Sequence, residues 1–219
     1  HANNCSSDLN AWLKLFREFS EAMGQKVDTD QLYEVMLNKA LEADPDAGGL
    51  LSYGYLSGEN ITGLEEGRPL FVRSPESQFN LANFMRAHLF SAFGALKIGM
   101  DILTKQENVA IERILAHGGL FKTPIVGQKI VAAAIEAPVS VMDTAGEGGA
   151  WGIAILASYM MYKKDNGSLD EFLDQRVFDH VDAQEIYPDS FDVKGFERFI
   201  ERYKKGLAIE QAAVNHLLH

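Results

Sequence analysis

The residues whose types and spacing could serve chemistry begin with two adjacent glycines. Gly118 and Gly119 follow residues 110–116, which have the composition of a strand, and precede Thr123-Pro124, which is expected to open a helix. A strand that stops at glycines before a helix leaves main-chain N–H groups uncovered, so a flat or phosphorylated ligand can approach them and the helix dipole. A tight turn without any ligand has the same residues, so the pattern alone leaves both interpretations open.

A second glycine-rich stretch, residues 146–152, spans a loop and the start of an expected apolar helix over residues 150–161. It does not fit the dinucleotide pattern GxGxxG, because Trp151 takes the place of the last glycine, and no GxxxxGK[ST] loop occurs in the sequence. Its small residues favour a structural interpretation over a ligand site. We expect Gly149 and Gly152 to let this helix press closely against the sheet or another helix.

Metal and nucleophile chemistry find little support. The six histidines lack HxxxH or HExxH spacing, and Cys5 is the single cysteine, so we predict no metal ligands and a reduced, cytoplasmic chain. With 31 acidic and 20 basic residues the net charge is -11, which opposes binding to nucleic acid or to an anionic membrane. The longest apolar stretch, residues 150–161, is shorter than the roughly 20 residues that a bilayer crossing needs.

Apolar spacing predicts the elements that must position the glycines. Helices are expected over residues 8–24, 29–41, 123–135, 150–161 and 194–218, and from Ser74, whose Ser-Pro-Glu sequence suits a helix start, to about residue 103. Short strands are expected at residues 49–56, 60–64, 69–73, 110–116 and 138–142. Strand, helix, strand, helix in succession predicts a parallel sheet covered by helices. Gly94 and Gly99, inside the long helix, each cost about 1 kcal/mol relative to alanine, which predicts close packing against another element.

Five stretches in chain order carry a resemblance to a known family: DLNAWL (8–13), YLSGEN (55–60), RAHL with the helix after it (86–103), HGGLFKT with Gln128 and Pro138-Val139 (117–139), and EGGAWGIAILA (147–157). Together they resemble the C-terminal domain of the FGGY family of carbohydrate kinases, which includes xylulokinase, ribulokinase, gluconokinase and glycerol kinase. The second stretch departs from the family pattern, with Gly54 for a proline and Asn60 for an arginine.

The resemblance implies an actin-like, ribonuclease H-like ATPase fold, with a mixed sheet flanked by helices and extra C-terminal helices. Residues 1–165 would form the N-terminally truncated nucleotide-binding domain, and residues 166–219 a helical extension packed on it. The function implied is that of the C-terminal domain of an ATP-dependent kinase acting on a ketopentose such as xylulose. Ribulose or another sugar or polyol is the alternative substrate, and a non-catalytic actin-like nucleotide-binding or regulatory module is the alternative function.

By position, the resemblance places the adenosine part of ATP on Gly118, Gly119, Leu120, Thr123, Ser7 and Ala11. Thr123, Ser7 and Ala11 stand where glycerol kinase has an asparagine, a glycine and a glutamine, whereas a backbone contact at Gly119 needs no particular side chain.

The family's first phosphate loop, its aspartate base and most of its sugar contacts belong to the N-terminal domain, and its second phosphate loop would precede His1. We therefore expect no catalytic residue in this chain. ATP and Mg²⁺ would be cofactors of the full-length enzyme, and a sugar and the missing N-terminal kinase domain its partners. A homodimer through the helix from Ser74 or the C-terminal helix is left open.

Overall fold

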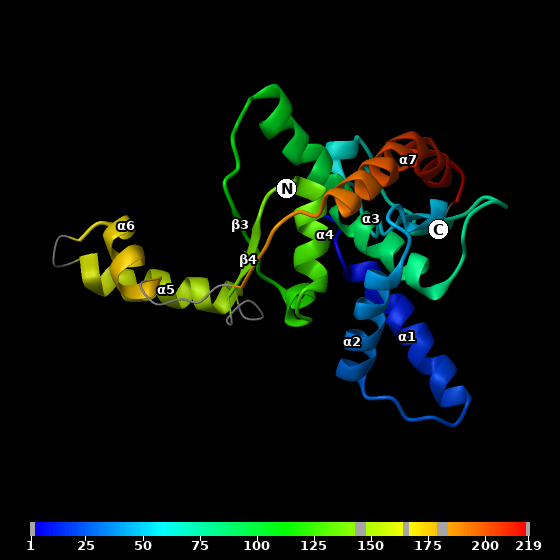
Figure 1. Ribbon diagram of the computed structural model, residues 1–219, viewed down its shortest axis with the longest axis horizontal. Coiled ribbons are helices and arrows are strands. Elements are labelled where there is room, and N and C mark those ends of the chain that lie inside the picture. Colours follow the sequence, from blue (N-terminus) through cyan, green and yellow to red (C-terminus); the bar gives the residue numbers. More distant parts are fainter. Residues whose placement is uncertain (1–2, 143–147, 164–166, 179–183, 218–219) are drawn as a thin grey trace.

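The computed structural model describes residues 3–142, 148–163, 167–178 and 184–217, arranged as Figure 1 shows. Within these ranges the α-helices are α1 (Ser7–Ala22), α2 (Thr29–Lys39), α3 (Leu81–Asp101), α4 (Val126–Ile135), α5 (Gly148–Tyr162), α6 (Leu169–Phe172) and α7 (Ser190–His216). The strands are β1 (Leu51–Tyr53), β2 (Leu70–Val72), β3 (Ile114–Leu115), β4 (Val139–Val141) and β5 (Gln184–Ile186). One π-helical turn continues α3 (Ile102–Gln106) and another follows α6 (Leu173–Val177).

The larger sheet contains the strand-helix-strand unit that the sequence predicts. β3 and β4 pair in parallel, with Ile114 opposite Val139, and α4 makes the crossover between them. Gln128 of α4 donates from Nε2 to the carbonyl oxygens of Val139 (3.2 Å) and Gln184 (2.8 Å), which ties the helix to β4 and β5. β5 lies antiparallel to β4, so the sheet is mixed.

Two boundaries near the glycine pair differ from the prediction. Of residues 110–116, only Ile114 and Leu115 form a strand, because only they pair with β4. The next helix begins at Val126 rather than at Thr123-Pro124. Residues 119–122 form a 3₁₀ turn, and Ile125 has a φ of 74°, which cannot continue into a right-handed helix.

α3 lies at the centre of the core, with residues 82–95 all buried. It does not begin at Ser74, as the sequence suggested. Ser74 donates its N–H to Ser77 Oγ (3.0 Å) in a local turn, and the helix starts after Asn80, whose side chain accepts the Asn83 N–H (2.9 Å). Serine caps turns as readily as helices, so the start was decided by where buried packing begins.

α7 packs across α3 and brings four large side chains into the core: Phe196, Phe199, Ile200 and Tyr203. The closest approach is at Gly94, where a Cβ would lie 2.7 Å from Cζ of Tyr203, which confirms the close packing predicted there. At Gly99 a Cβ would meet only Ile61, at an ordinary 3.9 Å, so that part of the prediction was wrong.

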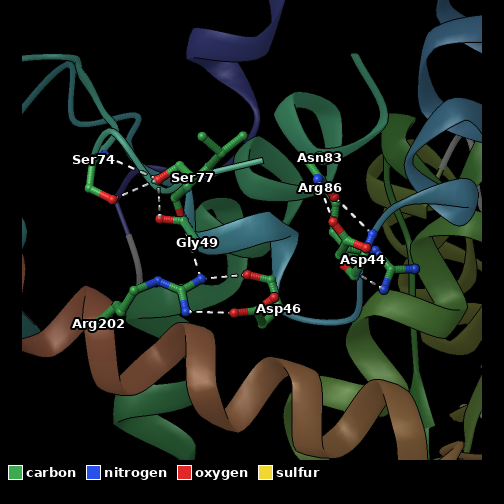
Figure 2. A network of polar contacts seen from close by, with 9 residues as sticks. Asp44, Asp46, Gly49, Ser74, Ser77, Asn83, Arg86 and Arg202 are labelled. Atoms are coloured by element: carbon green, nitrogen blue, oxygen red, sulfur yellow. Dashed lines mark hydrogen bonds and ion pairs between the residues drawn. The ribbon is translucent and has the colours of Figure 1, made fainter. Parts of the chain in front are cut away.

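The loop of residues 44–49 is held between α3 and α7 by the polar network in Figure 2. Arg202 of α7 donates to the carboxylate of Asp46 (2.9 Å) and also to its carbonyl oxygen. Asn83 of α3 donates to the Asp44 carboxylate (2.7 Å) and accepts the Asp44 N–H (2.8 Å). These contacts fix the approach to β1, which pairs antiparallel with β2.

The strand expected at residues 60–64 is instead a 3₁₀ turn, Asn60–Thr62, closed by an isolated antiparallel bridge between Glu59 and Leu64. The Glu59 N–H donates to the Leu64 carbonyl oxygen (2.8 Å), and the Leu64 N–H donates back (3.3 Å). A strand needs a ladder of such pairs, and here one pair closes the turn.

The close packing predicted for α5 is wrong. A Cβ at Gly149 or Gly152 would meet nothing within 4 Å, and Ile153 and Met160 are each 71% exposed. Figure 1 shows α5 and α6 together at one end of the molecule, away from α3 and α7. Residues 143–147 of the loop predicted before α5 lie outside the described residues. Among the described helices, none combines the length and apolar character needed to span a bilayer.

Candidate functional site

The glycine turn borders a groove of about 680 Å³. One wall is the segment that leaves β3, and the other is formed by α1 and α2. The lining residues are Ser6, Leu9, Asn10, Asp30, Tyr33, Glu34, Leu37, Gly119, Leu120, Lys122, Thr123 and Pro124.

Gly118 turns the chain from the end of β3 into this groove. Its φ of 121° is a conformation that L side chains rarely adopt, so the glycine is required by the backbone. The Phe121 N–H donates to the Gly118 carbonyl oxygen (3.0 Å), which closes the turn. Gly119 is exposed, and a Cβ added there would meet nothing within 4 Å, so the main chain on this side is open to a ligand.

The far end of the turn is held in an unusual conformation. Thr123 is buried, and Ile125, a β-branched residue, has a φ of 74°. With its ψ of -49°, Ile125 forms a rare γ-turn that is closed by the Val126 N–H and the Pro124 carbonyl oxygen (2.8 Å), a strained conformation that costs on the order of 1–3 kcal/mol. Strain of this kind persists where surrounding packing fixes it and is concentrated at ligand sites. Here it lies two residues after Thr123, at the entry to the buried helix α4.

The groove has an apolar floor and a polar rim. Leu9 and Leu37 are buried at its base, while Asp30 and Glu34 are exposed on α2. Apolar surface with a few fixed polar groups suits a flat heterocycle with hydroxyl groups attached, such as a nucleoside. The two carboxylates can accept bonds from hydroxyl groups and repel anions, whereas Lys122 on the other wall attracts them, so these charges favour a phosphate chain that leaves the groove away from α2.

The six predicted binding residues are only partly brought together. Gly119, Leu120 and Thr123 line the groove. Gly118 makes the turn without lining it, and Ser7 adjoins the lining residue Ser6. Ala11 is exposed on α1 and is not among the lining residues.

Sequence reasoning missed the whole second wall apart from α1. The side chains of α2 were assigned to an ordinary amphipathic helix, and only their place beside residues 119–124 gives them a role. Tyr33 of α2 donates its hydroxyl to Asn10 Oδ1 of α1, which joins the two helices at the groove. No local signal in the sequence pairs these residues.

α1 is fixed to the core by a buried polar chain that the sequence also did not reveal. Trp12 donates from Nε1 to Asp8 Oδ2 (3.1 Å), and Asp8 Oδ2 lies 3.9 Å from His88 Nδ1. The same ring nitrogen lies 3.0 Å from Ser52 Oγ. Burial raises the pKa of Asp8, although the bond from Trp12 opposes this.

Ser52, His88 and Asp8 meet in this group of polar contacts, yet they cannot act as a hydrolytic triad. Both Ser52 and Asp8 approach the same nitrogen of His88, whereas a triad uses opposite nitrogens of the ring. Ser52 is fully buried, and burial lowers the pKa of His88 to about 3, from an ordinary 6.5. The group is a structural tie between α1, β1 and α3.

Comparisons with known proteins identify the family. The family model for the C-terminal domain of the FGGY family of carbohydrate kinases matches residues 1–161. The chain therefore belongs to the FGGY family of carbohydrate kinases. Xylulose kinase of Haemophilus influenzae is 28% identical over 210 residues, which cover 92% of this chain and 40% of that protein. The chain thus spans about 40% of the length of this relative.

Solved structures agree on the fold. The crystal structure of xylulose kinase from Rhodospirillum rubrum superposes with a TM-score of 0.68 at 19% identity, covering 95% of this chain and 38% of that one. Plasmodium falciparum glycerol kinase with ADP gives a TM-score of 0.56 at 17% identity, covering 77% of this chain and 33% of that one. The chain has the actin-like ATPase fold of these sugar kinases, as the resemblance implied.

Proposed function

We propose that this chain is the C-terminal, nucleotide-binding part of an ATP-dependent sugar kinase whose substrate is a ketopentose, with xylulose the first candidate. The observation that carries the proposal is the groove beside Gly119, where exposed main chain faces an apolar floor in a member of a carbohydrate kinase family. Xylulose is favoured because the curated relative is a xylulose kinase.

In this proposal the adenosine part of ATP lies in the groove. Main chain at Gly119 and the side chains of Leu120 and Thr123 would contact the nucleoside, and Asp30 or Glu34 would accept bonds from its ribose hydroxyls. Bound ATP supplies the phosphoryl group that is transferred. Because carboxylates on α2 repel anions, the triphosphate would point away from that helix and toward the sugar.

The remaining chemistry would come from the preceding domain. Phosphoryl transfer needs a base for the sugar hydroxyl and Mg²⁺ held near the phosphates. Mg²⁺ is usually held by one or two carboxylates together with the substrate phosphates, and we propose that those carboxylates belong to the preceding domain. We propose that residues 1–165 act as the nucleotide-binding domain, residues 166–219 as its helical extension, and that the enzyme works in the cytoplasm.

The exposed helix α5 supports a partner for this chain. Its large apolar side chains Ile153, Leu156, Met160 and Met161 are between 56% and 71% exposed. Apolar surface on this scale is normally covered. Because this chain spans about 40% of the length of its relative, we propose that the polypeptide preceding residue 1 in the full-length protein packs on these exposed side chains of α5.

Hydrogen exchange tests this assignment. We expect the amides of α5 to be protected in the full-length monomer and to exchange faster in this chain alone. If the α5 amides exchange equally fast in both, or are protected only when the protein dimerises with rising concentration, the preceding polypeptide does not cover α5.

The function itself is tested with purified full-length protein, ATP and Mg²⁺ against a panel of keto- and aldopentoses and polyols, with ADP release followed by a coupled assay. We expect turnover with xylulose to exceed turnover with ribulose, and no turnover above background by residues 1–219 alone. Nucleotide binding without transfer to any sugar would assign the chain to a non-catalytic actin-like module instead. Turnover by residues 1–219 alone would refute the division of labour proposed here.

A further inference from the structure

The segment that leads into α1 is fastened to the loop after β1 by a buried carboxylate. Glu59 is fully buried, and its Oε2 accepts the backbone N–H groups of Asn3 (2.7 Å) and Asn4 (3.2 Å). One carboxylate oxygen has two lone pairs and can accept both bonds at once. A single side chain therefore fixes two consecutive peptide groups of this segment.

Asn4 completes the clamp from the other side. It is buried, its Oδ1 accepts the N–H groups of Leu56 (3.0 Å) and Ser57 (3.2 Å), and its Nδ2 donates to the Ser57 carbonyl oxygen (3.0 Å). We call Asn4 and Glu59 the Asn4–Glu59 clamp. Every bond in it joins residues that are more than 50 positions apart in the sequence.

The loop that carries Glu59 is itself rigid. A Cβ at Gly58 would lie 2.2 Å from the Glu65 carbonyl oxygen, so only glycine fits between the two sides of the loop. The bridge between Glu59 and Leu64 fixes the backbone on the next residue. This gives a physical reason for the adjacent Gly and Glu in the YLSGEN stretch: the glycine permits the close approach, and the glutamate anchors the distant segment.

The clamp determines where the groove begins. Ser6, two residues beyond Asn4, lines the groove, and Leu9 and Asn10 follow it on α1. Ser6 is also the N-cap residue of α1, yet its side chain makes no capping hydrogen bond. The start of this helix is therefore held by other contacts: those of the clamp before it, and the tie between Asp8 and His88 within its first turn.

Glu59 also has an unused acceptor. Its Oε1 is buried and has no hydrogen-bond partner among the described residues. Leaving a buried acceptor unpaired costs about 1–3 kcal/mol, so its retention calls for a reason. Glu59 therefore stays buried at a cost that its two bonds to the Asn3 and Asn4 N–H groups must offset.

We infer that Glu59 is a positioning residue for nucleotide binding, because it holds the chain entering α1 and thereby sets the α1 wall of the groove. The inference rests on the proposed function, since it takes the groove to be the nucleotide site. Glu59 does not line the groove and would act only through α1.

Glu59→Gln in the full-length protein tests this, with Glu210→Gln as the matched control. Glu210 is equally buried, its Oε1 accepts one backbone N–H, that of Arg68 (2.6 Å), its Oε2 has no partner among the described residues, and it does not line the groove. We expect E59Q to raise the KM for ATP about tenfold, equivalent to about 1.4 kcal/mol, with the KM for sugar within twofold of wild type. We expect E210Q to lower the melting temperature and leave both KM values unchanged.

Two results would overturn the inference: an unchanged KM for ATP in E59Q, or an equal rise in E210Q, which would make both residues merely structural. If E59Q does not fold, Glu59→Asp, which keeps the charge on a shorter side chain, carries the same comparison. Calorimetric titration with ADP needs no turnover, so it separates the two hypotheses. If wild type binds ADP but phosphorylates no sugar, the kinase proposal fails, and the ratio of the E59Q and E210Q dissociation constants still decides the role of Glu59.

Discussion

Replacing Gly119 by valine should separate ligand binding from folding. A Cβ at this position meets no atom within 4 Å, and the φ of Gly119 lies outside the left-handed range, so the folded backbone accommodates a side chain here and we expect the valine variant to fold. The same side chain would project into the groove and occupy space that a nucleoside needs. Adding methylene groups to a packed contact costs typically 1–3 kcal/mol. A loss of about 2 kcal/mol in binding corresponds to about a 30-fold weaker dissociation constant.

The assay is calorimetric titration of the full-length protein with ATP and ADP, together with thermal unfolding of each variant. Gly119→Ala serves as the graded control: one methyl group should weaken binding less than valine does, and neither variant should lower the melting temperature by more than about 2 °C. Unchanged affinity in the valine variant would remove Gly119 from the nucleotide site. Weaker binding with a matching loss of stability would show that the turn is packed rather than open, against the geometry described above.

Three further predictions concern the core. The pKa of His88 is about 3 in the folded chain and about 6.5 when exposed, so between these pH values the unfolded chain binds a proton that the folded chain does not. The free energy of unfolding should therefore fall by about 2 kcal/mol from pH 7 to pH 5. Urea unfolding of His88→Gln should lack this fall, and a pH profile identical to that of wild type would contradict the role given to His88. Gly206→Ala should lower the melting temperature despite alanine's better helix propensity, since its Cβ would lie 2.5 Å from the Tyr53 hydroxyl oxygen; a rise would show that the contact is loose. Asp192→Asn should cost about 2 kcal/mol in urea unfolding, because the buried Arg86 loses its charged partner at 3.2 Å, and a change below about 0.5 kcal/mol would count against that role.

Local sequence patterns are least reliable where contacts with other segments override them. Ser74-Pro75 has the sequence of a helix start, but Ser77 Oγ accepts the Ser74 N–H in a turn, and the helix begins only after Asn80. The small residues Gly149 and Gly152 were expected to allow close packing, yet nothing lies near them in the described part of the chain. Composition states what a segment could pack against, and only another segment decides whether it does.

Apolar spacing was enough to predict most of the helices and the parallel strand-helix-strand unit, and the glycine pair was enough to predict a turn at residues 118–119, because these depend on neighbours in the chain. Only the tertiary structure decided that α2 faces that turn across a groove and that Glu59 holds the segment before α1. Hydrogen bonds and packing between distant segments produce no periodic pattern in the sequence. A buried glutamate and a solvated one cannot be told apart there, because the partners that distinguish them come together only on folding.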